Sequence, residues 1–173
     1  EALSLLERQV SIAREQFGDR DPELARALEA LGHVHYSASR FPAAGEAFAE
    51  AENIRRSLGL TADAEWARLM HSIATNLRSQ QRFDEAIAYH RRAEIAARAL
   101  AQAHPSTLGN VLQGFAATYA EAGDYSNAEV HAREALPLLE GAIYEGHDLY
   151  ASGLNSLATV LRRQYQLDEA EDL

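Results

Sequence analysis

The sequence predicts an all-α fold, an α-solenoid in which antiparallel helical hairpins stack into a right-handed superhelix. Apolar residues follow a helical period, and no segment alternates apolar and polar residues as a strand does. Five alanines recur at a fixed spacing of 42 residues (44−2, 86−44, 128−86 and 170−128): Ala2, Ala44, Ala86, Ala128 and Ala170. A constant period of this length is typical of repeat architectures.

The segment 112–135 shows one repeat most clearly, as a helical hairpin. Phe115 and Tyr119 lie four residues apart on the apolar face of its first helix. We expect Gly123 to end that helix, because glycine readily adopts the left-handed conformation of a helix cap. Asp124 is then expected to begin the second helix of the hairpin.

The period divides the chain into five parts of a single array. Residues 1–20 are expected to form the second helix of a preceding repeat. Three full repeats follow over residues 21–60, 61–103 and 104–146, and a truncated repeat covers residues 147–173. Eight or nine helices are therefore expected.

Local signals mark the ends of several helices. Asp21 and Pro22 suit the cap and the first turn of a helix. Gly18 and Gly59 are expected to end the helices that precede them. Pro137 falls inside the second helix of the third repeat, where it removes a backbone hydrogen bond and predicts a kink or an early break.

Corresponding positions of successive repeats keep the same side-chain size, as stacked hairpins require in order to interdigitate. His90 and Ala132 depart from this rule, because they stand where the first full repeat has Phe48, and looser packing is expected around the second and third repeats. The large columns contain Leu24, Trp66, Leu108 and Tyr150, and Phe41, Phe83, Tyr125 and Leu167; the small column contains Gly32, Ala74, Ala116 and Ala158.

Other repeat folds with a similar period fit the sequence less well. Propeller blades need alternating strands, which the sequence lacks, and HEAT or armadillo arrays do not keep a column of small residues on both helices. Stacked hairpins with close helix contacts remain the expected architecture.

Composition excludes several functional classes. The absence of cysteine rules out disulfides, thiolate zinc sites and a cysteine nucleophile. The formal net charge of −10 argues against general nucleic-acid binding. No apolar run approaches the roughly 20 residues that span a bilayer, so we expect a cytoplasmic protein that binds neither nucleic acid nor membrane. The sequence begins with Glu1 rather than methionine, so it does not decide whether a targeting peptide has been removed.

Three segments resemble tetratricopeptide repeats of the 42-residue kind found in kinesin light chains and their bacterial relatives: FGDRDPELARALEALG at 17–32, GFAATYAEAGDYSNAE at 114–129 and LNSLATVLRRQYQLDEAE at 154–171. The resemblance covers essentially the whole chain. It implies a non-enzymatic scaffold that binds a protein or peptide partner within a larger signalling or adaptor protein. The sequence departs from the family in keeping the His-Pro element only at His104 and Pro105.

The resemblance also implies that the first helices of successive hairpins line a concave groove. Asn155 matches the asparagine that the family directs toward a bound peptide backbone, but the other repeats lack it. The columns assigned to the groove are mostly polar, which is also what an ordinary solvated face would show. The expected groove residues are Arg26, Glu29, His33, Tyr36, Arg68, His71, Thr75, Arg78, Asn110, Gln113, Asn155, Thr159 and Arg162.

These groove columns are basic although the chain as a whole is acidic. They contain a single acid, Glu29, against Arg26, Arg68, Arg78 and Arg162. Guanidinium groups form forked hydrogen bonds with carboxylates, so an acidic or carboxylate-bearing peptide is the expected partner. The alternative explanation is that the long arginine stems cover apolar surface.

The histidines and the chain ends leave two alternatives open. Glu29, His33 and His71 fall in neighbouring columns and form a candidate metal site, although no metal is expected. His90 and His131 are assigned to packing or to the outer face. No signature of nucleophilic, phosphate-binding or paired-carboxylate chemistry is present, so neither catalysis nor a cofactor is expected. The alternative function is structural self-association, giving a homo-oligomer through truncated ends with uncovered apolar faces.

Overall fold

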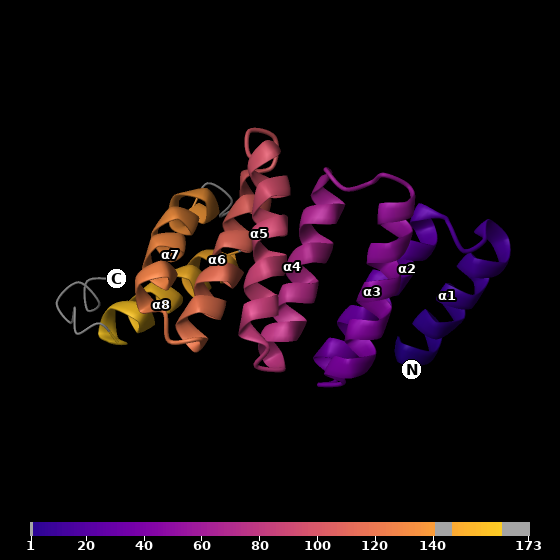
Figure 1. The fold of residues 1–173 in the computed structure, drawn as a ribbon, viewed down its shortest axis with the longest axis horizontal. Helices are drawn as coiled ribbons and strands as arrows, with labels where there is room; N and C mark the ends of the chain where they lie inside the picture. The colour runs from indigo at the N-terminus through magenta and orange to yellow at the C-terminus, as the bar shows by residue number, and fades with distance from the viewer. Residues whose placement is uncertain (1, 141–146, 164–173) are drawn as a thin grey trace.

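The computed structural model describes residues 2–140 and 147–163, which form eight helices lying side by side in a row (Figure 1). No strand occurs in these residues. The predicted all-α solenoid of stacked antiparallel hairpins is therefore confirmed. The helices are α1 (Ala2–Phe17), α2 (Pro22–Ser37), α3 (Phe41–Ser57), α4 (Ala64–Ser79), α5 (Phe83–Ala99), α6 (Pro105–Glu121), α7 (Tyr125–Glu140) and α8 (His147–Arg163).

Aspartate caps begin several helices. The Asp21 carboxylate accepts a hydrogen bond from the backbone amide of Glu23 at 2.8 Å, which confirms its predicted role at the start of α2. Asp63 caps α4 in the same manner by accepting from the amide of Trp66 at 2.7 Å. Asp124 accepts from a backbone amide in the first turn of α7 at 3.1 Å. Each cap satisfies a backbone donor that the helix itself leaves without a partner.

The turn inside each hairpin repeats one left-handed backbone conformation. Gly123, between α6 and α7, has φ +85°, as expected. The corresponding residues 42 positions apart are Ser39 with φ +58° and Gln81 with φ +60°, residue types that rarely adopt this conformation. Gly18 and Gly59, which follow α1 and α3, have φ +80° and +72°. The repeat therefore imposes the turn geometry whether or not glycine is present.

The hairpins pack in two layers. In the described residues, each helix contacts the next along the chain, and α2, α4, α6 and α8 also contact one another in succession. The backbones of α3, α5 and α7 do not approach one another in this way, so the layer of first helices lies on the concave side. Long side chains span the wider outer gaps: Arg98 of α5 donates to Glu134 of α7 at 2.6 and 2.9 Å.

The alanine column marks the closest approach of the helices. Ala44, Ala86 and Ala128 are each 0% exposed. A methyl group at these points lets the backbones of neighbouring helices come together, as ridge-and-groove packing requires. Leu167 and Ala170, the last members of their columns, lie outside the described residues.

The small column leaves room for larger neighbours. A Cβ atom at Gly32 would lie 2.5 Å from the ring of Phe48, so only glycine fits beneath that ring. In the next repeat His90 replaces Phe48 and is fully buried, and in the third repeat Ala132 is buried against Leu157 of α8. Both replacements are thus buried among neighbouring side chains, and the looser packing expected around them stays a prediction.

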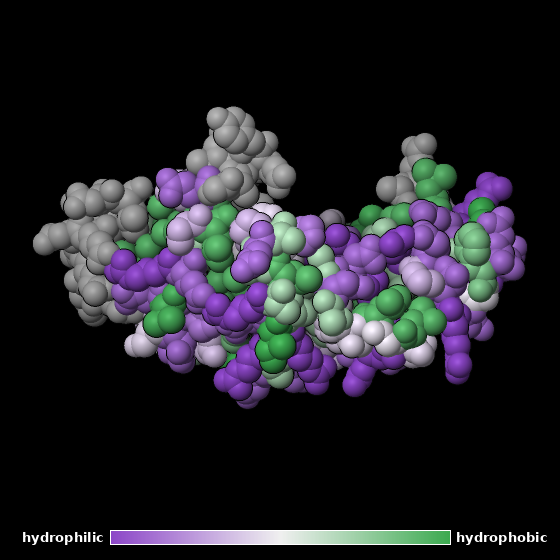
Figure 2. Space-filling model, turned by 90° about the horizontal axis from the view of Figure 1, so that it is seen from above, coloured by the Kyte–Doolittle hydropathy of each residue, from purple (hydrophilic) through white to green (hydrophobic). Residues whose placement is uncertain are grey.

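Near the end of the array, α7 continues through Pro137 to Glu140, so the predicted early break is wrong. The helix already has most of its length before the proline, which costs one backbone hydrogen bond close to the C-terminal end. None of the described helices combines the length and apolar character that a bilayer crossing requires. On the face shown in Figure 2, hydrophobic groups form several separate clusters among hydrophilic side chains.

A buried arginine fixes the junction between the first two full hairpins. Arg55 of α3 is 1% exposed, and its guanidinium donates at 2.6 Å to both Asp63 and Glu65 at the start of α4. Glu65 also accepts from Arg26 of α2 at 3.0 Å. Burial alone would raise the pKa of Glu65, but the hydrogen bonds from Arg55 and Arg26 outweigh it and lower this pKa. These bonds hold α2, α3 and α4 in the arrangement that shapes the groove.

Candidate functional site

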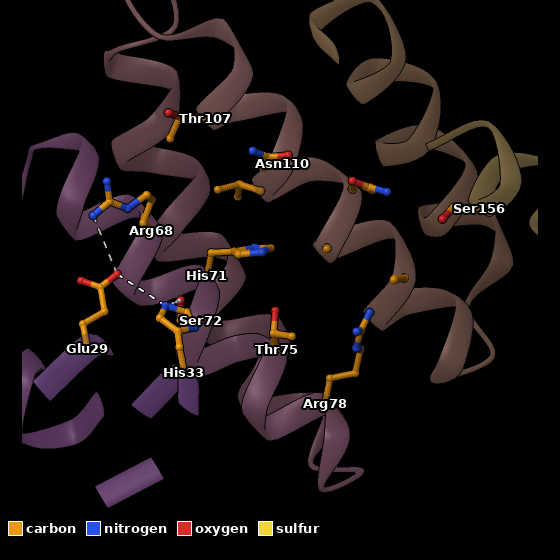
Figure 3. A pocket seen from close by; sticks show the side chains of 14 residues that line it. Glu29, His33, Arg68, His71, Ser72, Thr75, Arg78, Thr107, Asn110 and Ser156 are labelled. Carbon is orange, nitrogen blue, oxygen red and sulfur yellow. Dashed lines mark hydrogen bonds and ion pairs between the residues drawn. The ribbon is translucent and has the colours of Figure 1, made fainter. Parts of the chain in front are cut away.

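A groove of about 560 Å³ lies on the concave side, where α2, α4 and α6 face one another (Figure 3). Its wall on α2 carries Glu29, its wall on α4 carries Arg68 and Arg78, and α8 adds Ser156 at one edge. A second hollow of about 500 Å³ adjoins it between α6 and α8 and shares Ala117 and Ser156. Together the two hollows follow the row of first helices.

The structure places most of the expected groove residues around these hollows. Asn155 and Thr159 line the smaller hollow. Arg26 and Tyr36 line neither, because they bridge α2 to α4 by hydrogen bonds at 3.0 Å, and Arg162 is exposed near the end of α8. Eight of the thirteen line the larger groove: Glu29, His33, Arg68, His71, Thr75, Arg78, Asn110 and Gln113.

Six lining residues were outside the expected set. Ser72, Gly114 and Ser156 are spaced by 42 residues (114−72 and 156−114), and each directly follows a member of an expected groove column. The 42-residue period could therefore have predicted that Ser72, Gly114 and Ser156 line the groove. The six are Ser72, Thr107, Val111, Gly114, Ser156 and Ala117; the last of these belongs to the groove column of His33, Thr75 and Thr159, which the sequence did predict.

Two ion pairs cross the groove. Arg68 of α4 lies 3.9 Å from Glu29 of α2, and Arg78 of α4 lies 3.7 Å from Glu121 of α6. Both distances exceed those of hydrogen bonds. Glu29 also lies 3.8 Å from the His33 ring. The expected positive excess in the groove is therefore reduced, because Glu121 stands outside the columns assigned from the sequence.

A stack of rings forms the floor beneath the centre of the groove. The His71 ring points toward α6 over Gly114, where a Cβ atom would lie 2.4 Å from it (Figure 3). His71 and His90 have ring centroids 5.4 Å apart, and His90 stacks on Phe115 at 5.2 Å. The Thr118 hydroxyl donates to the Gly114 carbonyl at 2.9 Å and accepts from His90 Nε2 at 3.0 Å, so His90 carries its proton on Nε2.

The two histidines of this stack are neutral near neutral pH. Burial lowers the pKa of His71 to about 4, and repulsion from Arg78 and His33 adds to this effect. Burial also holds the pKa of His90 well below its ordinary value, with further repulsion from His71. These two rings therefore add no formal charge beneath the groove near neutral pH.

The candidate metal site does not form. Figure 3 shows His33 beside Glu29, whereas the His71 ring is turned toward α6. Within residues 2–140 and 147–163, no group of three histidine, aspartate or glutamate side chains is arranged to hold a metal ion. His33 instead lies with its Nε2 atom 3.3 Å from the Ser72 hydroxyl.

Stacked hairpins whose first helices line a concave groove define an α-solenoid with the architecture of an interaction scaffold. Family models of the tetratricopeptide repeat match residues 1–57, 66–141 and 151–173. The chain belongs to the tetratricopeptide repeat family. No curated protein matches the sequence.

Several solved structures share this fold. The structure of BtubC (BKLC) from P. vanneervenii has a TM-score of 0.85 and 20% identity, over 98% of this chain and 67% of the other. A structure of kinesin light chain TPR-like repeats from Podosopora anserina, which are nearly identical to one another, has a TM-score of 0.78 and 16% identity. The match covers 98% of this chain and 81% of the other. A Rap protein complexed with Competence and Sporulation Factor has a TM-score of 0.84 and 16% identity, over 98% of this chain and 45% of that protein.

Proposed function

We propose that this chain is a protein-binding or peptide-binding module of a larger signalling or adaptor assembly. Its concave groove holds an extended segment that presents at least one carboxylate to the groove arginines. The groove volume of about 560 Å³ is within the range of ordinary ligand sites. The similarity in fold to a Rap protein that is complexed with Competence and Sporulation Factor supports the binding of a protein or peptide partner.

The guanidinium groups of Arg68 and Arg78 carry this proposal. Other arginines of the chain donate to carboxylates at hydrogen-bonding distance: Arg55 to Asp63 at 2.6 Å and Arg98 to Glu134 at 2.6 Å. Among the described residues, the carboxylates nearest to Arg68 and Arg78 lie 3.9 and 3.7 Å away. These two side chains therefore retain N–H donors for a bound carboxylate.

The proposal can be tested with pools of acidic, neutral and basic peptides passed over the immobilised chain. Carboxylate-bearing pools should bind best, and their binding should weaken as salt is added, because salt screens exposed charges. Reversing both groove arginines, Arg68→Glu with Arg78→Glu, should abolish that binding.

A matched control separates the groove from overall charge. Arg20 and Arg91 are exposed residues outside the groove lining. The double variant Arg20→Glu with Arg91→Glu changes the net charge equally and should bind like the native chain. Best binding of neutral or basic pools, or an unchanged affinity after reversal of Arg68 and Arg78, would show that the proposed electrostatic role is wrong.

Self-association is a second candidate, favoured by the outer face of α1. Leu5 and Ile12, seven residues apart on that helix, are 63% and 41% exposed. Apolar faces at the edge of a solenoid need covering. Sedimentation over a range of concentrations should then reveal a dimer that Leu5→Gln with Ile12→Gln converts to a monomer. A native chain that stays monomeric at all concentrations would rule this candidate out.

A further inference from the structure

The two ion pairs of the groove differ in which partner is the less exposed one. In the pair on the α2 side, the carboxylate is enclosed and the arginine is free to move: the Glu29 side chain is 10% exposed and that of Arg68 is 58% exposed. In the pair on the α6 side, the arginine is the enclosed partner: the Arg78 side chain is 21% exposed and that of Glu121 is 53% exposed. Each pair therefore has one fixed and one movable charge.

The enclosed charges decide what a ligand meets. An exposed ion pair is worth little, so Arg68 or Glu121 turns into water at small energetic cost. An enclosed charge that loses its partner is unfavourable, so a replacement of opposite sign is favoured at both Glu29 and Arg78. When Arg68 turns away, Glu29 keeps only the His33 ring at 3.8 Å as a neighbour that could carry positive charge. A ligand that displaces the movable groups thus faces a negative charge on α2 and a positive charge on α4.

This asymmetry disfavours a ligand that is acidic along its whole length. A ligand carboxylate beside Arg68 would also approach the largely buried Glu29 carboxylate, which lies 3.9 Å from Arg68 and would repel it. A carboxylate beside Arg78 meets no such obstacle, because the competing Glu121 can turn away. The two groove arginines are therefore not equivalent as anion sites.

The wall between the fixed charges is neutral and polar. Ser72 and Thr75 of α4 lie between the Glu29 end and the Arg78 end, and Asn110 of α6 lines the groove nearer to Thr107 (Figure 3). Hydroxyl and amide groups both donate and accept hydrogen bonds. Such a wall suits the backbone of an extended peptide that joins two charged groups.

We propose that the groove recognises a dipolar peptide segment, with a cationic group against Glu29 and a carboxylate against Arg78. The inference rests on the proposed peptide-binding function and specifies which ligand charge goes to which end. Without a ligand, Arg68 pairs with Glu29 and Glu121 pairs with Arg78. When the ligand binds, its own charges replace these two side chains, which turn into solvent.

Four peptide libraries of matched length test this assignment. Two fixed positions, separated by random spacers of varied length, carry lysine and glutamate, two glutamates, two lysines or two glutamines. The dipolar library should be retained about tenfold more tightly than the doubly acidic one, the factor that corresponds to one well-placed charge pair.

Variants of the chain then locate each charge. Glu29→Gln should lower the affinity for a selected dipolar peptide about tenfold and leave a doubly acidic peptide no weaker. Arg78→Gln should weaken both peptides, whereas Arg68→Gln should not weaken the dipolar one. Glu46→Gln, at an exposed position of α3, is the control for net charge and should change nothing.

The outcomes separate this inference from the proposed function. If the doubly acidic library binds best and Glu29→Gln strengthens it, the groove binds acidic peptides and the dipolar assignment is wrong. If Arg68→Gln and Arg78→Gln weaken the dipolar peptide equally, the distinction between fixed and movable charges is also wrong. If no library binds, both the proposed function and this inference fail.

Discussion

Phe48 of α3 lies so close to the backbone of Gly32 in α2 that a Cβ atom at Gly32 would come within 2.5 Å of the ring. Phe48 is itself 1% exposed and has little space to withdraw. Gly32→Ala should therefore lower the free energy of unfolding by about 1–3 kcal/mol through overpacking, despite the higher helix propensity of alanine. Urea denaturation measures this loss.

The second repeat offers the matched rescue, because it combines Ala74 with His90 at the same two positions. The double variant Gly32→Ala with Phe48→His should be more stable than the sum of the single changes predicts, by on the order of 1 kcal/mol. Strict additivity would mean that the two residues do not constrain each other.

Leucine in place of Ala86 or Ala128 should destabilise the chain by about 1–3 kcal/mol, because both alanines are fully buried where helices touch. The same substitution at Ala62, which is exposed before α4, is the control and should have little effect. Melting temperatures of the three variants provide the comparison. Equal values for all three would contradict the assigned repeat frame.

Asp63→Ala should destabilise the chain more than Asp21→Ala, although both residues cap a helix. Loss of a cap alone costs about 1 kcal/mol. Asp63 also accepts from the buried Arg55 at 2.6 Å, so its removal leaves that guanidinium with Glu65 alone, and a total loss of about 2–4 kcal/mol is expected. Chemical denaturation should resolve the difference, and similar losses for both variants would show that the Arg55 contact adds nothing.

Acidification should destabilise the chain through His71. An unfolded histidine takes up a proton near pH 6.5, whereas folded His71 does so only near pH 4. The unfolded state therefore binds more protons between these values, so the free energy of unfolding falls as the pH drops through this window. The full shift corresponds to at most about 3 kcal/mol, less for a ring that is partly exposed.

Denaturation curves between pH 7 and pH 4 measure this contribution. His71→Gln should flatten the decline, because glutamine does not titrate. His104→Gln, at an exposed position before α6, is the control and should leave the decline unchanged. A decline of the same steepness in His71→Gln would show that other groups cause it.

The fold was predictable from the sequence because a repeat tests each position several times. The period identified Ala44, Ala86 and Ala128 as contact points, and all are fully buried. The ring that packs beside His90 could not be predicted from its own column, because His71 belongs to another column and its ring centroid lies 5.4 Å from that of His90. Contacts between different columns are not encoded by the period.

The same limit applies to the candidate site. Its columns placed Arg68 and Arg78 on the concave side, where both line the groove. Their electrostatic partners could not be predicted, because Glu121 comes from the end of a neighbouring helix and its reach depends on the spacing between α4 and α6. Arg26 was assigned to the groove as well, yet Glu65 holds it outside.

The hairpin turns differ in the backbone strain that they carry. Ser39 and Gln81 hold the left-handed conformation that Gly123 adopts without strain, and such a conformation costs a non-glycine residue about 1–2 kcal/mol. The turns of the first and second full hairpins are thus strained, whereas the turn of the third is not. An engineered array assembled from copies of the third turn would keep the geometry of every hairpin and lose that strain at each joint.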